Sequence, residues 1–128
     1  MFNWRRPANL GVKDGRLAPC KRTPNCVSSQ ADPTDHEHYI APIAFRGSAA
    51  ELRRAVESMA RARVIKTERD YLYAEYRTRL MRYVDDLELY YDEKQGLVHV
   101  RSASRLGRRD FGVNRDRVEA LRRTIAKL

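Results

Sequence analysis

The sequence lacks any apolar run near the length of about 18 residues that a membrane-spanning helix needs. Its beginning also lacks the apolar stretch of a secretory signal, and the segment after Arg5-Arg6 is too polar for a twin-arginine signal. We therefore expect a soluble, cytoplasmic protein without a transmembrane segment.

Cysteine and histidine are scarce, with two and three residues respectively. Cys20 and Cys26 are too far apart for a C-x2-C zinc site, and no second cysteine pair exists. Because cytosolic thiols are normally reduced, we favour two structural thiols, followed by a disulfide. A mixed metal site with Asp35, His36 and His38 comes next, and a catalytic cysteine last. We expect no metal and no cofactor.

No catalytic signature stands out. Asp85 and Asp86 are neighbours on an expected strand, so their side chains point to opposite faces and cannot form one carboxylate dyad. The sequence therefore favours a non-enzymatic ligand-binding or scaffold domain. The alternative is an enzyme that uses Cys26 or Asp85 beside the arginines described below.

Length and charge indicate one basic domain. The chain has 128 residues, 42% of them hydrophobic, which suffices for a core without structural metals or several disulfides. The net charge of +9 is uneven, because residues 1–30 and 101–128 are strongly basic whereas residues 31–100 carry more acids than bases. If the two ends meet in the fold, they form a surface that attracts anions.

The hydrophobic pattern predicts an irregular arm over residues 1–38, packed on a single α+β domain over residues 39–128. Ser48 and Glu51 form a capping box at the start of a helix that extends to about Ala60. Asn114 is the expected N-cap of a last helix. The expected strands are Ile40–Phe45, Arg63–Thr67, Tyr71–Thr78, Arg82–Tyr91 and Leu97–Ser102.

This β-α-β-β-β-β-α order predicts an antiparallel sheet with both helices on one face, a two-layer sandwich of TATA-binding-protein-like or minimal helix-grip topology. The other face is then open, and a solvated face is the favoured interpretation. Nucleobase stacking on its tyrosines is the weaker alternative, because acidic residues share that face and repel phosphates. The residues expected there are Tyr71, Tyr73, Arg77, Asp86, Glu88, Tyr90, His99 and Arg101.

The segment Arg101–Arg117 holds six arginines together with serines and glycines at a strand–helix junction. Arginine matches phosphate and carboxylate with planar paired donors. A phosphorylated or other anionic small molecule is therefore the expected partner. Binding of nucleic acid through the basic ends of the chain is a second, less favoured alternative, and the sequence predicts no oligomeric state. The expected ligands are Arg101, Ser102, Ser104, Arg105, Asn114 and Arg115.

An internal network is the competing interpretation of the same arginines, because buried arginines are usually paired. In that case Arg101 or Arg105 pairs with Asp85, Asp86 or Asp110. Asp85 lies on the same face as the apolar residues of its strand, so we expect Asp85 to be the buried, paired member and Asp86 to be solvated.

Several blocks of sequence resemble a known family. They are LAPCKRTPNCVSSQ at Leu17–Gln30, DHEHYIAPI at Asp35–Ile43, YVDDLELYY at Tyr83–Tyr91 and VRSASRLGRRDFGVNRDRVEALR at Val100–Arg122. Together they resemble the bacterial and plastid proteins grouped as domain of unknown function family 1499, from about Leu10 onward. The resemblance implies no chemistry, and many relatives look exported or membrane-linked.

Overall fold

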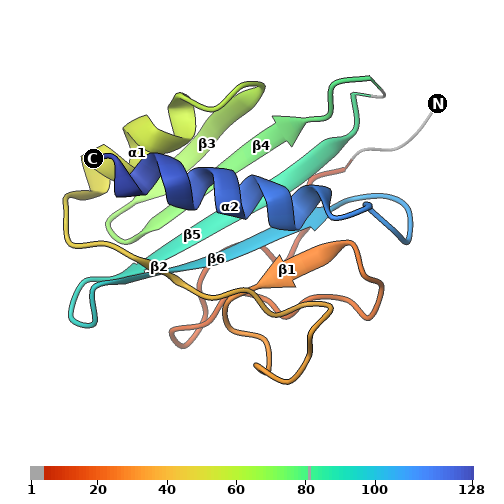
Figure 1. The fold of residues 1–128 in the computed structure, drawn as a ribbon, viewed down its shortest axis with the longest axis horizontal. Coiled ribbons are helices and arrows are strands. Elements are labelled where there is room, and N and C mark those ends of the chain that lie inside the picture. The colour runs from red at the N-terminus through yellow and green to blue at the C-terminus, as the bar shows by residue number, and fades with distance from the viewer. Residues whose placement is uncertain (1–4, 81) are drawn as a thin grey trace.

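The structure, a computed structural model, describes residues 5–80 and 82–128. A six-stranded antiparallel sheet and two helices make up the fold (Figure 1). The strand order is β1-β6-β5-β4-β3, and β2 pairs with β6 beside β1. The elements are β1 (Cys26–Ser28), β2 (Ile43–Ala44), α1 (Ala49–Glu57), β3 (Ala62–Glu68), β4 (Tyr71–Arg77), β5 (Val84–Asp92), β6 (Leu97–Ser104) and α2 (Val113–Ala126).

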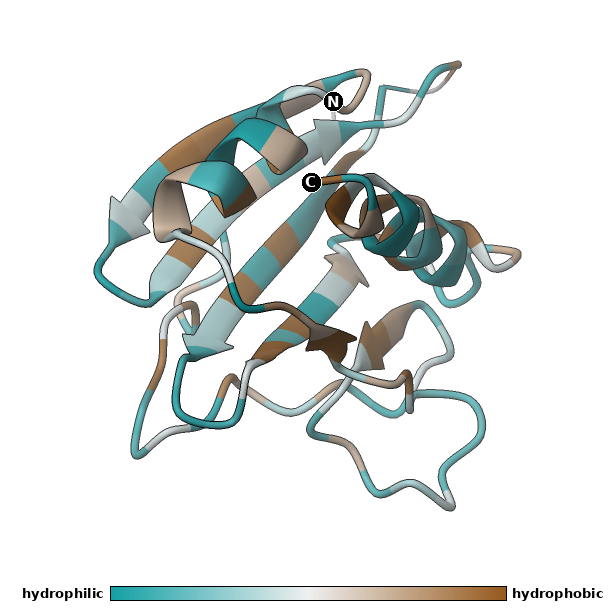
Figure 2. Ribbon diagram, turned by 60° about the vertical axis from the view of Figure 1, so that its left-hand side comes forward, coloured by the Kyte–Doolittle hydropathy of each residue, from teal (hydrophilic) through white to brown (hydrophobic). Residues whose placement is uncertain are grey.

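Both helices cover one face of this sheet, which confirms the predicted α+β class and two-layer arrangement (Figure 1). The period-2 alternation of β4, β5 and β6 turns their apolar residues toward the helices. Figure 2 shows this alternation as bands along the strands. The core of this face contains Leu72, Ala74, Tyr76, Leu87, Leu89, Tyr91, Val98 and Val100, with Val56, Val118 and Leu121 from the helices.

The two helices begin differently. Ser48 is the N-cap of α1, and its capping box with Glu51 is present as predicted. The predicted N-cap of α2 is wrong, because Gly112 rather than Asn114 holds that position. Gly112 has φ of 81°, which glycine adopts at little cost. The Asp110 carboxylate instead accepts the Gly112 and Asn114 amide hydrogens, at 2.9 and 3.1 Å.

The N-terminal arm is more regular than predicted. Its described part, residues 5–38, contributes β1, which the sequence did not indicate. Cys26, Val27 and Ser28 pair antiparallel with Ala103, Ser102 and Arg101 of β6. The arm thus forms one edge of the sheet.

The same arm also covers the second face of the sheet, so the prediction of an open, solvated face is wrong. Leu17 packs on Tyr71 and Tyr73 in a small second core, which Leu10 and Val12 extend. In Figure 1 this part of the arm passes behind the strands. The sheet therefore lies between two helices on one side and an extended chain on the other.

Neither helix of the described chain combines the length and the apolar composition that crossing a bilayer requires.

Candidate functional site

An ionic network lies between the arm and the second face of the sheet, with Arg105 at its centre. The Arg105 guanidinium donates to Asp86 at 2.8 and 2.9 Å and to Glu75 at 2.6 Å. Its side chain is only 7% exposed. Tyr73 donates to Asp86 in the same cluster, and Arg6 of the arm adds a second ion pair to Glu75. Burial alone disfavours the Arg105 charge, but the hydrogen bonds to Asp86 and Glu75 outweigh it and raise the pKa of Arg105.

Arg101 lies on the same face and holds the arm in place. Its Nη1 is 3.7 Å from Glu88 Oε1, and its Nη2 donates to the carbonyl of Pro19 in the arm. Glu88 also accepts from the Tyr71 hydroxyl at 2.6 Å and the Gly11 amide at 2.7 Å. Burial lowers the pKa of Arg101, although Glu88 opposes this effect. Both side chains of this pair are buried.

A separate ion pair lies on the helix side of the sheet. Arg117 of α2 places its Nη1 2.9 Å from Asp85 Oδ2, and its guanidinium lies 4.6 Å from the centre of the Tyr76 ring. Burial raises the pKa of Asp85, and the charge of Arg117 only partly offsets it. Asp85 and Asp86 are therefore both buried and both paired, so the prediction of a solvated Asp86 is wrong.

A hydrogen-bond network centred on Asn114 connects β6 to the start of α2. Ser102 donates to Asn114 Oδ1 at 2.7 Å, and Asn114 Nδ2 donates to Ser104 at 2.9 Å and to Asp110 at 2.8 Å. It also donates to the carbonyl of Asn25, adjacent to β1. Asn114 is fully buried, so its side chain serves the fold.

These contacts change the interpretation of the predicted anion site. Arg101, Ser102, Arg105 and Asn114 are engaged inside the protein, and Arg115 donates to backbone carbonyls in the arm. These side chains do not point together into one solvent-accessible pocket. The arginine corner therefore contains an internal network at the positions where we expected ligand contacts.

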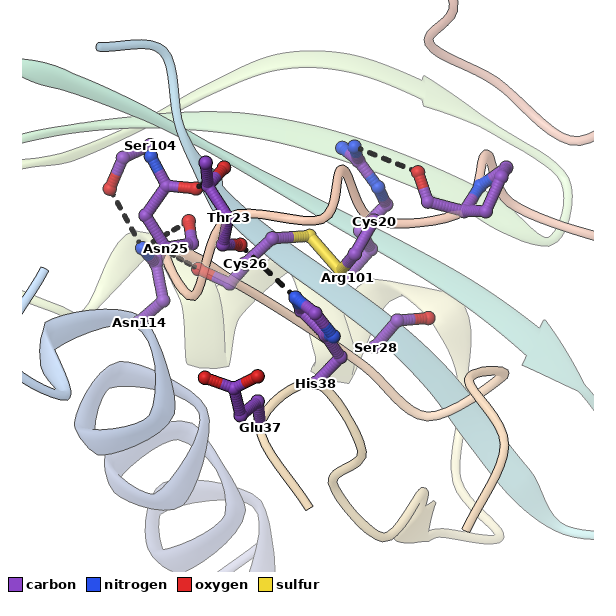
Figure 3. The surroundings of a disulfide bond; sticks show 12 residues. Cys20, Thr23, Asn25, Cys26, Ser28, Glu37, His38, Arg101, Ser104 and Asn114 are labelled. Carbon is purple, nitrogen blue, oxygen red and sulfur yellow. Dashed lines mark hydrogen bonds between the residues drawn. A yellow bond between two sulfur atoms is a disulfide. The ribbon is translucent and has the colours of Figure 1, made fainter. Parts of the chain in front are cut away.

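Cys20 and Cys26 form a disulfide, which corrects the preference for free thiols. Figure 3 shows it beside Arg101 and the ring of His38. His38 bonds to Asp35 through Nδ1 at 2.7 Å and to the Thr23 carbonyl through Nε2 at 3.0 Å. Burial opposes the charged imidazolium, but Asp35 and the Thr23 carbonyl outweigh it and raise the pKa of His38. His38 thus links Thr23, inside the disulfide loop, to Asp35 in the segment that follows β1.

Metal ligands do not gather here. No group of three or more His, Cys, Asp or Glu side chains could hold a metal ion within residues 5–80 and 82–128.

A large hollow opens at another place, between the β4–β5 loop and the β6–α2 loop. This loop groove has a volume of about 710 Å³. Apolar side chains from both loops line it, and the Asp85 and Asp110 carboxylates lie in its wall. The two loops project from the same end of the molecule (Figure 1). The apolar lining consists of Leu80, Leu106, Phe111 and Val113, with Tyr83 beside them.

A second hollow, of about 270 Å³, adjoins the loop groove and shares Thr78 and Arg79 with it. We call it the arginine hollow, because four of its five lining residues are arginines and none is acidic. Arg61 and Arg77 come from the β3–β4 side, and Arg79 and Arg82 from the β4–β5 loop. An apolar groove and a cationic hollow therefore lie next to each other and share two lining residues.

Neither hollow was predicted from the sequence. A usable signal was present, because Thr78–Tyr83 and Arg108–Phe111 each combine two arginines with at least one large apolar residue in a short connection. Leu80 and Phe111 lie in loops, so the alternation of a strand or the period of a helix assigns them to no face. The two loops come close together only because β4, β5 and β6 pair in the sheet.

The chain matches no curated protein and no solved structure. It does match a family model, described as "Protein of unknown function (DUF1499)", over residues 16–125. This range includes the disulfide, the loop groove, and Arg101, Arg105 and Arg117 with their carboxylate partners, whereas Arg6 and Gly11 of the arm lie before it. The chain therefore belongs to that family of proteins of unknown function.

Proposed function

We propose that this protein is a non-enzymatic binding domain for an amphiphilic anion. The anionic group occupies the arginine hollow, and the apolar body of the ligand occupies the loop groove. The observation that carries this proposal is that the two hollows are adjacent and share Thr78 and Arg79 in their lining.

The charges of the lining residues favour an anion in the arginine hollow and not in the loop groove. Arginine donors match phosphate, sulfate and carboxylate oxygens, and the arginine hollow has no acidic lining residue to compete for them. The loop groove differs, since Asp85 and Asp110 lie in its wall. These carboxylates are already engaged by Arg117 and by the start of α2, and they repel an anion that enters head first. The ligand is therefore expected to enter with its charge toward Arg79.

Size also supports a small amphiphile. Ligand pockets commonly have volumes of about 300–1,000 Å³ and a mainly apolar lining with a few placed polar groups. The loop groove lies within that range and has this kind of lining.

Dodecyl phosphate, used as a monomer, is the direct test. We expect isothermal titration calorimetry to detect its binding, and to show at least tenfold weaker binding of inorganic phosphate and of dodecyltrimethylammonium. Arg79→Gln is expected to weaken dodecyl phosphate binding about tenfold, because a charge-assisted hydrogen bond is lost. Arg123→Gln, at an exposed position of α2, is the matched control and should leave affinity unchanged. Equal binding of all three compounds, or equal effects of both variants, contradicts the proposal.

The enzymatic alternative receives less support. Cys26 is joined to Cys20, so it offers no thiolate, and Asp85 is buried against Arg117. The disulfide also favours an oxidising compartment over the expected cytoplasm. Mass spectrometry of protein alkylated during lysis tests this point, because an oxidised pair takes up no alkyl groups. Full alkylation at both cysteines contradicts an oxidising location.

A further inference from the structure

The two loops around the groove carry apolar side chains that protrude from the protein. Leu80 is 88% exposed and Phe111 is 93% exposed. Val113, also exposed, lies between them and the rest of α2 in the wall of the same groove. Exposed apolar groups gathered in this way mark interaction surfaces, because water disfavours them.

Arginines surround these apolar tips. Arg79 and Arg82 flank Leu80 in the β4–β5 loop, and Arg108 and Arg109 precede Phe111 in the β6–α2 loop. All four are exposed, and within the described chain none of them forms an ion pair with an acidic group. The charged ends of these side chains are therefore free to contact an external anion.

We propose that this end of the protein docks on the surface of an anionic lipid bilayer. Leu80 and Phe111 enter the boundary between headgroups and acyl chains, while Arg79, Arg82 and Arg109 contact lipid phosphates. The proposal rests on the proposed function, because it identifies the amphiphilic anion as a phospholipid whose headgroup occupies the arginine hollow.

Charge complementarity selects this occupant. A basic side chain near an anionic bilayer contributes about 1 kcal/mol of attraction. An isologous contact between two copies would instead bring the same arginines opposite each other. A bilayer also accepts two protruding tips at once, because its interior is fluid and apolar, whereas an apolar pocket in a partner protein must be preformed for each tip. The arginine rim and the apolar tips thus fit the two layers of a membrane surface.

Co-sedimentation with vesicles tests the proposal with the whole chain. We expect binding to phosphatidylcholine vesicles that contain about one third phosphatidylglycerol, weaker binding at higher salt, and little binding to phosphatidylcholine alone. Phe111→Ser and Leu80→Ser are each expected to reduce vesicle binding about tenfold, because each removes one exposed apolar side chain that enters the bilayer on docking. Leu128→Ser is the matched control, since Leu128 is 56% exposed at the C-terminal end of the chain and away from the groove. Unchanged circular dichroism verifies that each variant is folded.

Several outcomes overturn the proposal. One is equal binding to both kinds of vesicle, and another is an equal loss in Leu128→Ser and Phe111→Ser. Binding of dodecyl phosphate monomers without binding of anionic vesicles rejects membrane docking and leaves the proposed function intact, whereas binding of neither rejects both. A Phe111-dependent mobility shift with an oligonucleotide, or Phe111-dependent binding of an acidic peptide, in the absence of vesicle binding, assigns the surface to a different macromolecule.

Discussion

Arg105→Met gives the sharpest test of the buried ionic network. The substitution keeps an unbranched side chain of similar length and removes the guanidinium that Asp86 and Glu75 share. Asp86, 2% exposed, is left with Tyr73 as its side-chain donor. Glu75 keeps its ion pair with Arg6 and its contact with the Tyr73 hydroxyl. Breaking a buried pair in this way typically costs about 3–5 kcal/mol, because a charge stays buried without compensation.

Such a loss is large beside the total stability of a domain, which is about 5–15 kcal/mol. Urea denaturation followed by circular dichroism measures it directly as a fall in the free energy of unfolding. At roughly 4 °C per kcal/mol, the melting temperature is expected to fall by roughly 12 °C or more. Arg108→Met is the control in the same loop, and since Arg108 is exposed its effect should stay within about 0.5 kcal/mol.

The pH dependence provides a second check. Burial favours the protonated form of Glu75, but the hydrogen bonds from Arg105 and Arg6 outweigh it and lower the pKa of Glu75. This contribution to stability is present above the unfolded pKa of about 4.3 and is lost as the pH falls through the lower folded value. The gap between the wild type and Arg105→Met should therefore narrow in acid. A loss below about 1 kcal/mol at neutral pH, or a gap that widens in acid, refutes the reasoning.

Three further predictions concern the arm and the start of α2. Reducing the disulfide between Cys20 and Cys26, which are 6 residues apart, should lower the free energy of unfolding by about 2 kcal/mol, with no effect of reductant on the double alanine variant. His38→Gln should lower the free energy of unfolding, and urea denaturation across pH measures the difference from the wild type. The difference should be fully present below about pH 6.5 and should shrink as the pH rises through the raised pKa of folded His38. A difference that grows with pH contradicts the contact between His38 and Asp35. Asp110→Ala should lower the free energy of unfolding by about 1–2 kcal/mol, because α2 loses the carboxylate that accepts its first amide hydrogens. Thermal denaturation measures this loss, and an unchanged melting temperature contradicts the role of Asp110.

The local sequence pattern was sufficient to predict most of the sheet face that the helices cover. The alternation in β4, β5 and β6 identified which residues face the core, and Ser48 with Glu51 identified the start of α1. These features depend on residues a few positions apart, whose spacing determines the face on which each side chain lies. The α+β class followed from them.

The local sequence pattern could not predict that the arm covers the second face of the sheet. Its polar residues look like those of a solvated face, and the arm lacks periodicity, so neither segment indicates that it covers the other. The contacts that join them are distant in sequence: Gly11 bonds Glu88 from 77 residues away, and Arg6 bonds Glu75 from 69. The partners of Asp85 and Asp86 were undetermined for the same reason.

By itself, the sequence determined the class of fold, the apolar face of each strand and the presence of an arginine-rich junction, because these are properties of composition and short-range spacing. Only the tertiary structure decided which arginines are enclosed and which remain available. Packing of the arm against the second face of the sheet buried Arg101 and Arg105. The loops at the strand ends instead left Arg79 and Arg109 in solvent near Leu80 and Phe111. That division arises because chain-distant segments supply the partners that make a buried charge tolerable.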